Sequence, residues 1–502
     1  MSNKSGGAGG ILSVISDKNE GMRFKRARLM QPGLTAQNYC MPILLPGVIS
    51  RFDAASPSYA SHPTADRFVD TFTAEQASQA LAQRQYQAAA TVLPLSIWVC
   101  VAFGKSVCHH CAGSASSTPH AHSQTYLRYL SREADLQTRH LGRDQQACQL
   151  HLSGPSLTAL CDDELRELMK MLHGGFNFAP DGNYTVKVDP RSIDAARLRT
   201  LAELGFNRLS LGVQDFDPAV QQAVHCVHRT QPVEQLFSLV ESARVLGFKS
   251  VNLQLMFGLP RQTPESFDCT LEQITSLQPD RIALYAYTHL PQPFKSHRRT
   301  MPTELPTEGA RSLMLSRSLS TLKKAGYVHV GLDYFALPAD SLAIAKRQGR
   351  LHRNFLGFSA QPDCDLISLG VSAIGRVGAS YSQNAQTLKA YYSCLDQGRL
   401  PVVRGLVLTR DDLVRRSVIM ALICQGRLEF ESISLVHLID FKSYFLAELT
   451  LLQSMQTEGL VEVSDTDLQI TIRGGHFARS VAAVFDRYLQ ADHIREKSFS
   501  MV

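Results

Sequence analysis

The sequence predicts an α/β fold built on a parallel sheet, either open or curled into a partial (β/α) barrel, with a smaller, mostly helical C-terminal domain. Two observations lead to this prediction. From about residue 94 to residue 290, six short apolar runs alternate with five longer runs of helical period. Beyond about residue 405, helical patterns dominate the chain.

The expected strands are short buried runs, in chain order LSIWVCVAF (95–103), CQLHLSG (148–154), YTVKVD (184–189), RLSLGVQDF (208–216), SVNLQLMFGLP (250–260) and RIALYAYTHL (281–290). The expected helices cover 123–138, 162–176, 194–206, 233–248 and 264–277. Two of these helices end in Leu-Gly-Phe, where Gly205 and Gly247 are expected to cap the helix C-terminus. In such folds the chemistry lies on loops that follow the C-terminal ends of the strands.

Four segments are expected along the chain. Residues 1–44 are rich in Gly, Ser, Lys and Arg and are predicted to form a flexible tail. Residues 45–93 form an N-terminal elaboration, and residues 94–400 form the barrel with its extension. Residues 401–502 form the helical domain, which contains a hairpin-like run, LVEVSDTDLQITI (460–472).

Composition excludes several classes of protein. The chain has 502 residues, of which 44% are hydrophobic and 19% charged, as in a globular protein. The net charge of +6 (51 basic minus 45 acidic residues) is too small to indicate nucleic-acid binding. Eleven cysteines without regular spacing suit a reducing compartment. The start of the chain has no secretory h-region and no apolar segment reaches membrane-spanning length, so we expect a cytoplasmic protein.

The loop after the first expected strand, within VAFGKSVCHHCAGSAS (101–116), contains Cys108 and Cys111 with His109 and His110 between them. Longer strings then resemble a known family, in order and from about residue 45 to the C-terminus: PSYASHPTADRF, GFNRLSLGVQDF, GLPRQTPESF, DRIALYAYTHLP, GRLHRNFLGF and LISLGVSAIG. They resemble the oxygen-independent coproporphyrinogen III dehydrogenases, which are radical S-adenosylmethionine (SAM) enzymes of haem biosynthesis. The resemblance implies a partial (β/α) barrel of radical SAM type.

The resemblance also implies a [4Fe–4S] cluster held by three cysteines in C-x₃-C-x₂-C spacing. Cys108 and Cys111 match the last two, but the first position is Gly104, which has no side chain. Cys100 lies about 13 Å upstream of Gly104 in an extended strand and is not expected to replace it. A stable cluster needs charged thiolates, so we expect no cofactor here. An active chain would carry [4Fe–4S] and SAM.

The positions matching the family's SAM pocket are also altered. The family's Gly-Gly-Gly-Thr-Pro turn reads Ser153-Gly154-Pro155-Ser156, in which proline removes an amide donor. Lys187 replaces a glutamate that binds SAM, and Gln254 replaces an aspartate. The retained or nearly retained positions are Gly154, Ser156, Gln214, Arg229 and Ile374. Framework strings are kept while cofactor positions change, which predicts a pseudoenzyme.

The histidine-rich loop allows a second interpretation. CHHCAGSASSTPHAH (108–122) could hold zinc or another divalent metal through a set drawn from Cys108, His109, His110, Cys111, His120 and His122. The H-x-H spacing differs from the usual H-x₃₋₅-H, and a loop without any ligand is the alternative.

Basic residues offer further candidate contacts, each with a structural alternative. Lys187 could form an anion site with Arg229 or Arg191, or be a surface lysine. HLPQPFKSHRRT (289–300) could pair with porphyrin propionates through Lys295, His297, Arg298 and Arg299, or be a solvated loop. His352 and Arg353 of LHRNF could face a tetrapyrrole or stabilise the fold.

Three functions remain. The first is a non-catalytic protein that binds a porphyrin, porphyrinogen or haem, or a partner protein. The second is the active dehydrogenase, which converts two propionates of coproporphyrinogen III to vinyls and so forms protoporphyrinogen IX. The third is a metal or SAM protein without radical chemistry.

Overall fold

Parallel strands form the centre of the chain. The computed structural model describes residues 59–88, 94–101, 120–141, 145–154, 160–225, 232–289 and 300–492. A twelve-stranded sheet has the order β14-β13-β12-β11-β1-β2-β3-β4-β5-β6-β8-β7. The parallel strands are β1 (Leu95–Cys100), β2 (Gln146–Ser153), β3 (Asn177–Val188), β4 (Arg208–Gln214), β5 (Ser250–Phe257), β6 (Arg281–Ala286) and β11 (Asp365–Leu369). The first six confirm the predicted strands.

Antiparallel strands extend this parallel part at both edges. On one side lie β12 (Ile374–Val377), β13 (Ser380–Asn384) and β14 (Val402–Val407), and on the other β8 (Tyr334–Ala336) and β7 (Val328–Gly331). The sequence prediction missed β11, which pairs with β1 although their first residues are 270 positions apart. A hairpin of β9 (His352–Asn354) and β10 (Gly357–Ser359) forms a separate small sheet.

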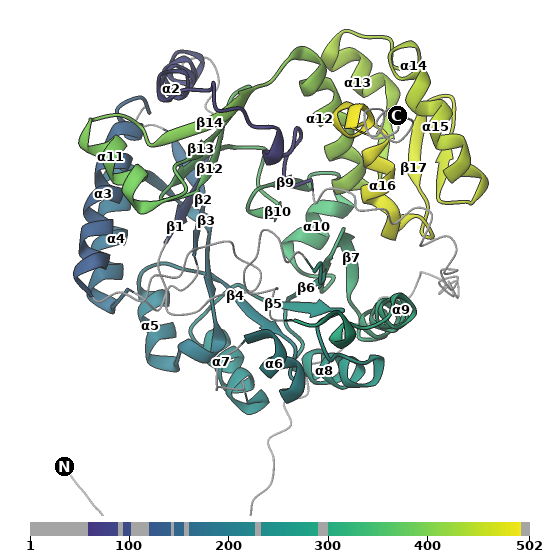
Figure 1. Cartoon of the computed structure of the whole chain (residues 1–502), viewed down its shortest axis with the longest axis horizontal. Coiled ribbons are helices and arrows are strands. Elements are labelled where there is room, and N and C mark those ends of the chain that lie inside the picture. The colour runs from purple at the N-terminus through teal and green to yellow at the C-terminus, as the bar shows by residue number, and fades with distance from the viewer. Residues whose placement is uncertain are drawn as a thin grey trace, which may run out of the picture. The chain divides into compact units, whose positions relative to one another are not determined.

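Helices cover the outer face of the curved sheet, as Figure 1 shows for α3, α4, α5, α7 and α8. These are α3 (His120–Thr138), α4 (Asp162–Gly175), α5 (Ala195–Glu203), α7 (Val233–Val245) and α8 (Pro264–Leu277), and they confirm the predicted helices. The short α6 (Pro218–His225) was not predicted. The remaining helices of this part are α2 (Ala74–Ala88), α9 (Glu308–Lys324), α10 (Ser341–Arg347) and α11 (Leu388–Asp396).

The two Leu-Gly-Phe sequences end their helices as predicted. Gly205 and Gly247 have φ angles of 91° and 83°, which a residue with a side chain adopts at a cost. The amides of Phe206 and Phe248 then donate back to carbonyls inside α5 and α7, at 3.1 and 3.0 Å. This pattern of C-terminal hydrogen bonds is the Schellman motif.

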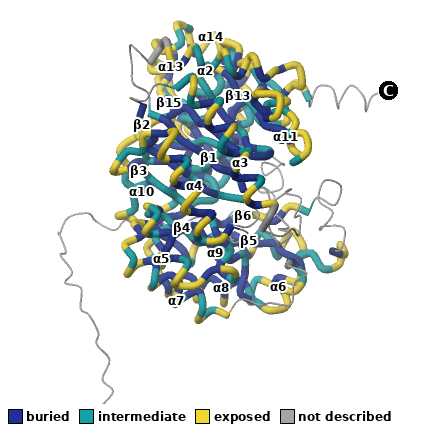
Figure 2. The backbone as a smooth tube through the Cα atoms, turned by 90° about the vertical axis from the view of Figure 1, so that its left-hand side faces the viewer, coloured by how far each residue is buried: buried dark blue, intermediate teal, exposed yellow. Residues whose placement is uncertain are grey.

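Each central strand separates an apolar outer face from a polar inner face. On β1, Leu95, Ile97 and Val99 are buried in the large core between sheet and helices. Side chains alternate along a strand, so Ser96 and Trp98 face the other way. Figure 2 shows the strands as mostly buried, with exposed residues concentrated on the helices. The polar inner face is therefore where a ligand can bind.

The C-terminal region has its own core and a small sheet. Its helices are α12 (Arg410–Gln425), α13 (Phe430–His437), α14 (Phe441–Tyr444), α15 (Leu446–Thr457) and α16 (Ala478–Ala483). The predicted hairpin is confirmed as β16 (Val461–Val463) and β17 (Asp467–Ile470), which β15 (Arg427–Glu429) joins. After this hairpin the chain is helical again in α16 and from residue 487 to the last described residue, 492, as the helical patterns beyond residue 405 predicted. The segment boundaries at residues 44, 93 and 400 remain predictions.

No helix in the described ranges is long and apolar enough to cross a membrane.

Candidate functional site

The inner face of the sheet carries a row of polar side chains near the C-terminal ends of the strands. Trp98 on β1 is in register with His151 on β2, which is in register with Thr185 on β3. Trp98 Nε1 donates a hydrogen bond to Ser153 Oγ at 2.8 Å. Burial, and then the positive charge of Lys187, lower the pKa of His151 to about 4. The imidazole is therefore neutral at physiological pH.

Gly154 lies where β1 and β2 end close together. Its φ angle is 148°, and a Cβ there would lie only 2.0 Å from the carbonyl oxygen of Val101. The amide of Val101 donates to the carbonyl of Ser153 at 2.7 Å, which continues the pairing of the two strands. Only glycine fits this close approach, which lets the end of β2 lie against Val101, the last described residue before the predicted cluster loop.

Lys187 and Gln254 occupy positions where the family resemblance implied acidic groups. Lys187 on β3 is in register with Ser210 on β4. Gln254 on β5 donates to the Ser210 hydroxyl at 3.2 Å. Arg191 pairs with Asp189 rather than joining Lys187 in an anion site, because its Nε and Nη2 donate to the Asp189 carboxylate at 2.8 and 2.6 Å. This stretch of the inner face is basic and neutral-polar where family members are acidic.

The retained SAM-pocket positions fall in different surroundings. Gln214 ends β4 with a φ angle of 68°. Its buried Oε1 has no hydrogen-bond partner within the described part of the chain, so it could accept one from a ligand. Ile374 on β12 packs beside the cluster of Phe68, Tyr381 and Leu408. In the sheet order, β12 lies two strands from β1, on the side away from β2.

A buried network, which the sequence analysis missed, explains two of the family-like strings. Gln262 of GLPRQTP accepts from the amides of Gly258 and Leu259 at 2.6 and 3.1 Å and donates to Asp215 of VQDF. The Thr270 hydroxyl donates to the same carboxylate at 2.9 Å. Burial raises the pKa of Asp215. These residues hold the loop after β5 against the end of β4, which is a structural role. The sequence feature that could have indicated this network is the presence of polar residues, such as Asp215 and Gln262, next to apolar strand ends.

The LHRNF string also has structural contacts. Arg353 donates to the carbonyl of Tyr59 at 3.2 Å, and its guanidinium lies 4.7 Å from the centre of the Phe358 ring. Burial lowers the pKa of His352, which lies near Asp363 and Arg416. Asp363 itself binds Arg376 and Arg416. These contacts favour the interpretation that His352 and Arg353 stabilise the fold.

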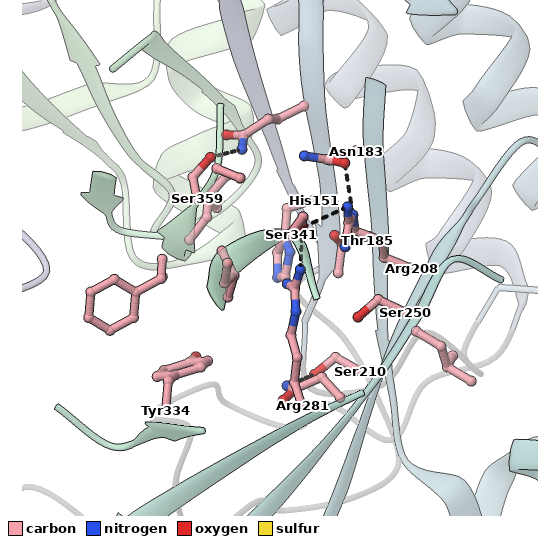
Figure 3. Close-up of a pocket in the computed structure, with 18 of the residues that line it drawn as sticks. His151, Asn183, Thr185, Arg208, Ser210, Ser250, Arg281, Tyr334, Ser341 and Ser359 are labelled. Carbon is pink, nitrogen blue, oxygen red and sulfur yellow. Dashed lines mark hydrogen bonds between the residues drawn. The ribbon is translucent and has the colours of Figure 1, made fainter. Parts of the chain in front are cut away.

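A cavity of about 100 Å³ opens on the inner face and extends from His151 and Thr185 towards the N-terminal ends of β4, β5 and β6. Its lining includes Arg208, Ser250 and Arg281, which are the first residues of β4, β5 and β6. Figure 3 shows Arg208 and Arg281 converging on the hydroxyl of Ser341, with Tyr334 and Ser359 on the opposite side. The sequence analysis did not identify this cavity. The sequence feature that could have indicated it is the polar residue at every second position of SVNLQ (250–254) and RLS (208–210), which places polar side chains on one face of each strand.

Many predicted ligands lie outside the described residues. They are Gly104, Cys108, His109, His110, Cys111, Ser156, Arg229 and the basic group Lys295, His297, Arg298 and Arg299. His120 is the first residue of α3, and the His122 side chain is exposed. Within the described part of the chain, no group of three or more His, Cys, Asp or Glu side chains is arranged to hold a metal ion. The metal site of the 108–122 loop remains a prediction.

Comparison with known proteins agrees with the fold. The Radical SAM superfamily matches residues 104–274. The oxygen-independent coproporphyrinogen III oxidase of Pseudomonas aeruginosa is 42% identical over 458 residues, which cover 91% of this chain and 98% of that protein. The enzyme of the same name from Salmonella typhimurium is 39% identical, with 91% and 97% covered.

Among solved structures, the coproporphyrinogen III oxidase of Escherichia coli, described as a radical SAM enzyme, matches with a TM-score of 0.81. Its sequence is 38% identical, and the match covers 86% of this chain and 97% of that one. The chain therefore belongs to the oxygen-independent coproporphyrinogen III oxidase family of radical SAM proteins.

Proposed function

We propose that this member of the family lacks radical SAM catalysis and acts in the cytoplasm as a protein that binds a tetrapyrrole or a protein partner. The donor set for a [4Fe–4S] cluster carries the proposal. Three thiolates are needed, and the sequence supplies Cys108 and Cys111 with Gly104 at the first position. The residues present therefore do not fit the cluster.

Cys100 is the thiol nearest upstream, and its surroundings argue against its use. Burial raises the pKa of the Cys100 thiol to about 12, so it is protonated at neutral pH. Its carbonyl accepts a hydrogen bond from the Tyr126 hydroxyl at 2.5 Å, which holds the end of β1 in place. Recruiting this sulfur would require the strand end to unfold and the thiol to ionise, and both steps cost free energy.

The SAM pocket supports the same conclusion. SAM carries a sulfonium and an ammonium group, so acidic side chains suit it, whereas Lys187 and Gln254 offer an ammonium and an amide. Gln214 and Gly154 remain compatible with SAM, but they supply no charge. The alternative function is the active dehydrogenase, with [4Fe–4S] and SAM, and it is favoured by the family relationship across nearly the whole chain.

Tetrapyrrole binding is supported by the charge of the inner face. The relatives are named for coproporphyrinogen III, a tetrapyrrole with carboxylate side chains. Lys187 projects a basic group onto the inner face, and basic side chains form strong charge-assisted hydrogen bonds with carboxylates. A chain that has lost the cluster can therefore still recognise the propionates.

The first experiment measures iron and acid-labile sulfide after anaerobic reconstitution, with electron paramagnetic resonance of the reduced protein. The 42% identical relative from Pseudomonas aeruginosa, treated in parallel, is the positive control. We expect no stoichiometric cluster in this chain. A full cubane cluster whose spectrum changes when SAM is added would overturn the proposal in favour of the active enzyme. Titration with coproporphyrin and haem then tests binding, and the absence of saturable binding would leave only the protein-partner form of the proposal.

A further inference from the structure

We propose that the cavity around Arg208 binds a small oxyanion that carries a hydroxyl group, namely inorganic hydrogen phosphate. The site lies at the N-terminal ends of β4, β5 and β6, whereas the predicted cluster loop follows the C-terminal end of β1. The proposal does not depend on whether the chain retains radical catalysis.

Arg208 brings a positive charge that no carboxylate neutralises directly. Its Nε donates to Asn183 Oδ1 at 2.8 Å and its Nη2 donates to Ser341 Oγ at 3.3 Å. It forms no ion pair with any residue in the described ranges, and its Nη1 has no hydrogen bond there. A guanidinium is planar and offers its donors in fixed directions, so the remaining donor can bind an oxyanion.

The second arginine of the cavity makes the contrast clear. Arg281 Nε donates to Asp340 Oδ2 at 2.9 Å, and Arg281 Nη2 donates to the same Ser341 hydroxyl at 2.9 Å. One carboxylate thus neutralises Arg281, while Arg208 is left without a direct counter-charge. Burial, and then the neighbouring Arg281, lower the pKa of Arg208 to about 10. The group stays charged at neutral pH, and a bound anion would relieve the repulsion.

The rest of the lining suits an anion that also carries a proton. Beside the two arginines, the described residues that line the cavity offer hydroxyl and amide groups and the His151 imidazole, and none of them is a carboxylate. Asn252 Nδ2 donates to Ser210 Oγ at 3.0 Å, while its buried Oδ1 has no hydrogen-bond partner among the residues that the structure describes. That acceptor needs a donor, which the P–OH of hydrogen phosphate supplies and a sulfate or carboxylate anion does not. A volume of about 100 Å³ is enough for a single phosphate group.

The test is isothermal titration calorimetry of the full chain at pH 7 and constant ionic strength. The ligands are inorganic phosphate, sulfate, acetate and glycerol phosphate. We expect phosphate to bind saturably and at least about tenfold more tightly than the others, which at this pH mostly lack the acidic O–H that Asn252 requires. Phosphate binding no tighter than that of sulfate would overturn the assignment.

Two variants test the residues, with a matched surface control. Arg208→Gln removes the charge, and Asn252→Asp places a carboxylate in the cavity with almost no change in volume. Each is expected to weaken phosphate binding at least about tenfold. Arg166→Gln on α4 removes an exposed arginine and should leave binding unchanged. Circular dichroism checks that each variant folds. If Arg208→Gln does not fold, Asn252→Asp alone tests the site. A folded variant of either kind that binds phosphate as tightly as the wild type would overturn the proposal.

Discussion

Lys187 lies near enough to His151 for its ammonium group to influence the buried imidazole on the neighbouring strand. Two causes lower the pKa of His151 to about 4: burial has the larger effect, and the positive charge of Lys187 has the smaller one. The family resemblance implies a glutamate at position 187, and its negative charge would raise the pKa of His151 instead of lowering it. The same substitution that removes an acidic group from the predicted SAM pocket therefore adds to the effect of burial in keeping His151 neutral.

Replacing Lys187 with glutamate is expected to raise the pKa of His151. The change removes a positive charge and adds a negative one, and a negative neighbour favours the imidazolium. The pKa is measured from the His151 ring signals in a nuclear magnetic resonance titration between pH 3 and 8. Lys187→Gln serves as the matched neutral control and should give a smaller rise. An unchanged pKa in the glutamate variant would contradict the proximity of the two groups.

Gly104→Cys is expected to leave the chain without coproporphyrinogen turnover. A third cysteine completes the C-x₃-C-x₂-C spacing, so the iron content after reconstitution should increase. Lys187 and Pro155 nevertheless remain in the SAM pocket. Product formation and iron content are measured on the same sample, with the triple variant Gly104→Cys, Pro155→Gly, Lys187→Glu for comparison. Full turnover by the single variant would show that the SAM pocket is intact.

Glu133 on α3 is expected to make the protein less stable as pH rises from about 4.5 to 7. The carboxyl group is completely buried and accepts hydrogen bonds from Gly370, Asn384 and Tyr391, at 2.7, 2.6 and 2.6 Å. Burial nevertheless raises its pKa from 4.5 to about 7. The folded state therefore binds the proton more tightly than the unfolded state, and the stability it contributes at low pH is lost as pH rises through this window.

The size of this effect is about 3 kcal/mol across the window, because each pKa unit is worth about 1.4 kcal/mol. Glu133→Gln should remove this contribution. His151 contributes a pH dependence of the opposite sign in the same range, because its lowered pKa makes stability fall as pH drops from 6.5 towards 4. This His151 contribution is present in both proteins and cancels when the variant is compared with the wild type. Urea unfolding at a series of pH values compares variant with wild type. The difference in unfolding free energy should change with pH, and a constant difference would contradict the raised pKa.

Cys148 and Cys364 are expected to form a disulfide when the protein is treated with peroxide. Their Sγ atoms lie 3.3 Å apart in the interior, between the bulged start of β2 and the residue before β11. The two thiols lose two protons and two electrons, and peroxide is reduced to two waters. The bond would close a loop of more than 200 residues and raise the unfolding free energy by up to roughly 4 kcal/mol.

Peptide mapping under non-reducing conditions detects the linked pair. Cys148→Ser is the control and should show no link and no gain in stability on oxidation. Cys161 and Cys269 are exposed and report that the oxidant reached the protein. Oxidation of these exposed thiols without any Cys148–Cys364 link would contradict the prediction.

The elements that the sequence predicted correctly depend on neighbours within a few positions. The strands β1 to β6 follow from their apolar runs, and the ends of α5 and α7 follow from Gly205 and Gly247. The altered positions Gly104 and Lys187 were read from the sequence by their place relative to strings that resemble the family, and their roles remain predictions. By contrast, β11 could not be predicted, since its partner β1 is distant in the sequence.

The sequence by itself determined the family, the order of the β/α units and the altered donor set, because periodicity, helix caps and motif strings are local properties. Only the tertiary structure decided what each side chain meets. It brought Ser341 to Arg208 across 133 positions and Cys364 to Cys148 across 216. It also withdrew the Cys100 thiol and the His151 imidazole from solvent and placed Glu133 and Lys187 near them, which shifts their pKa values. Burial and charge depend on residues that the closing of the sheet brings together, and no local pattern encodes them.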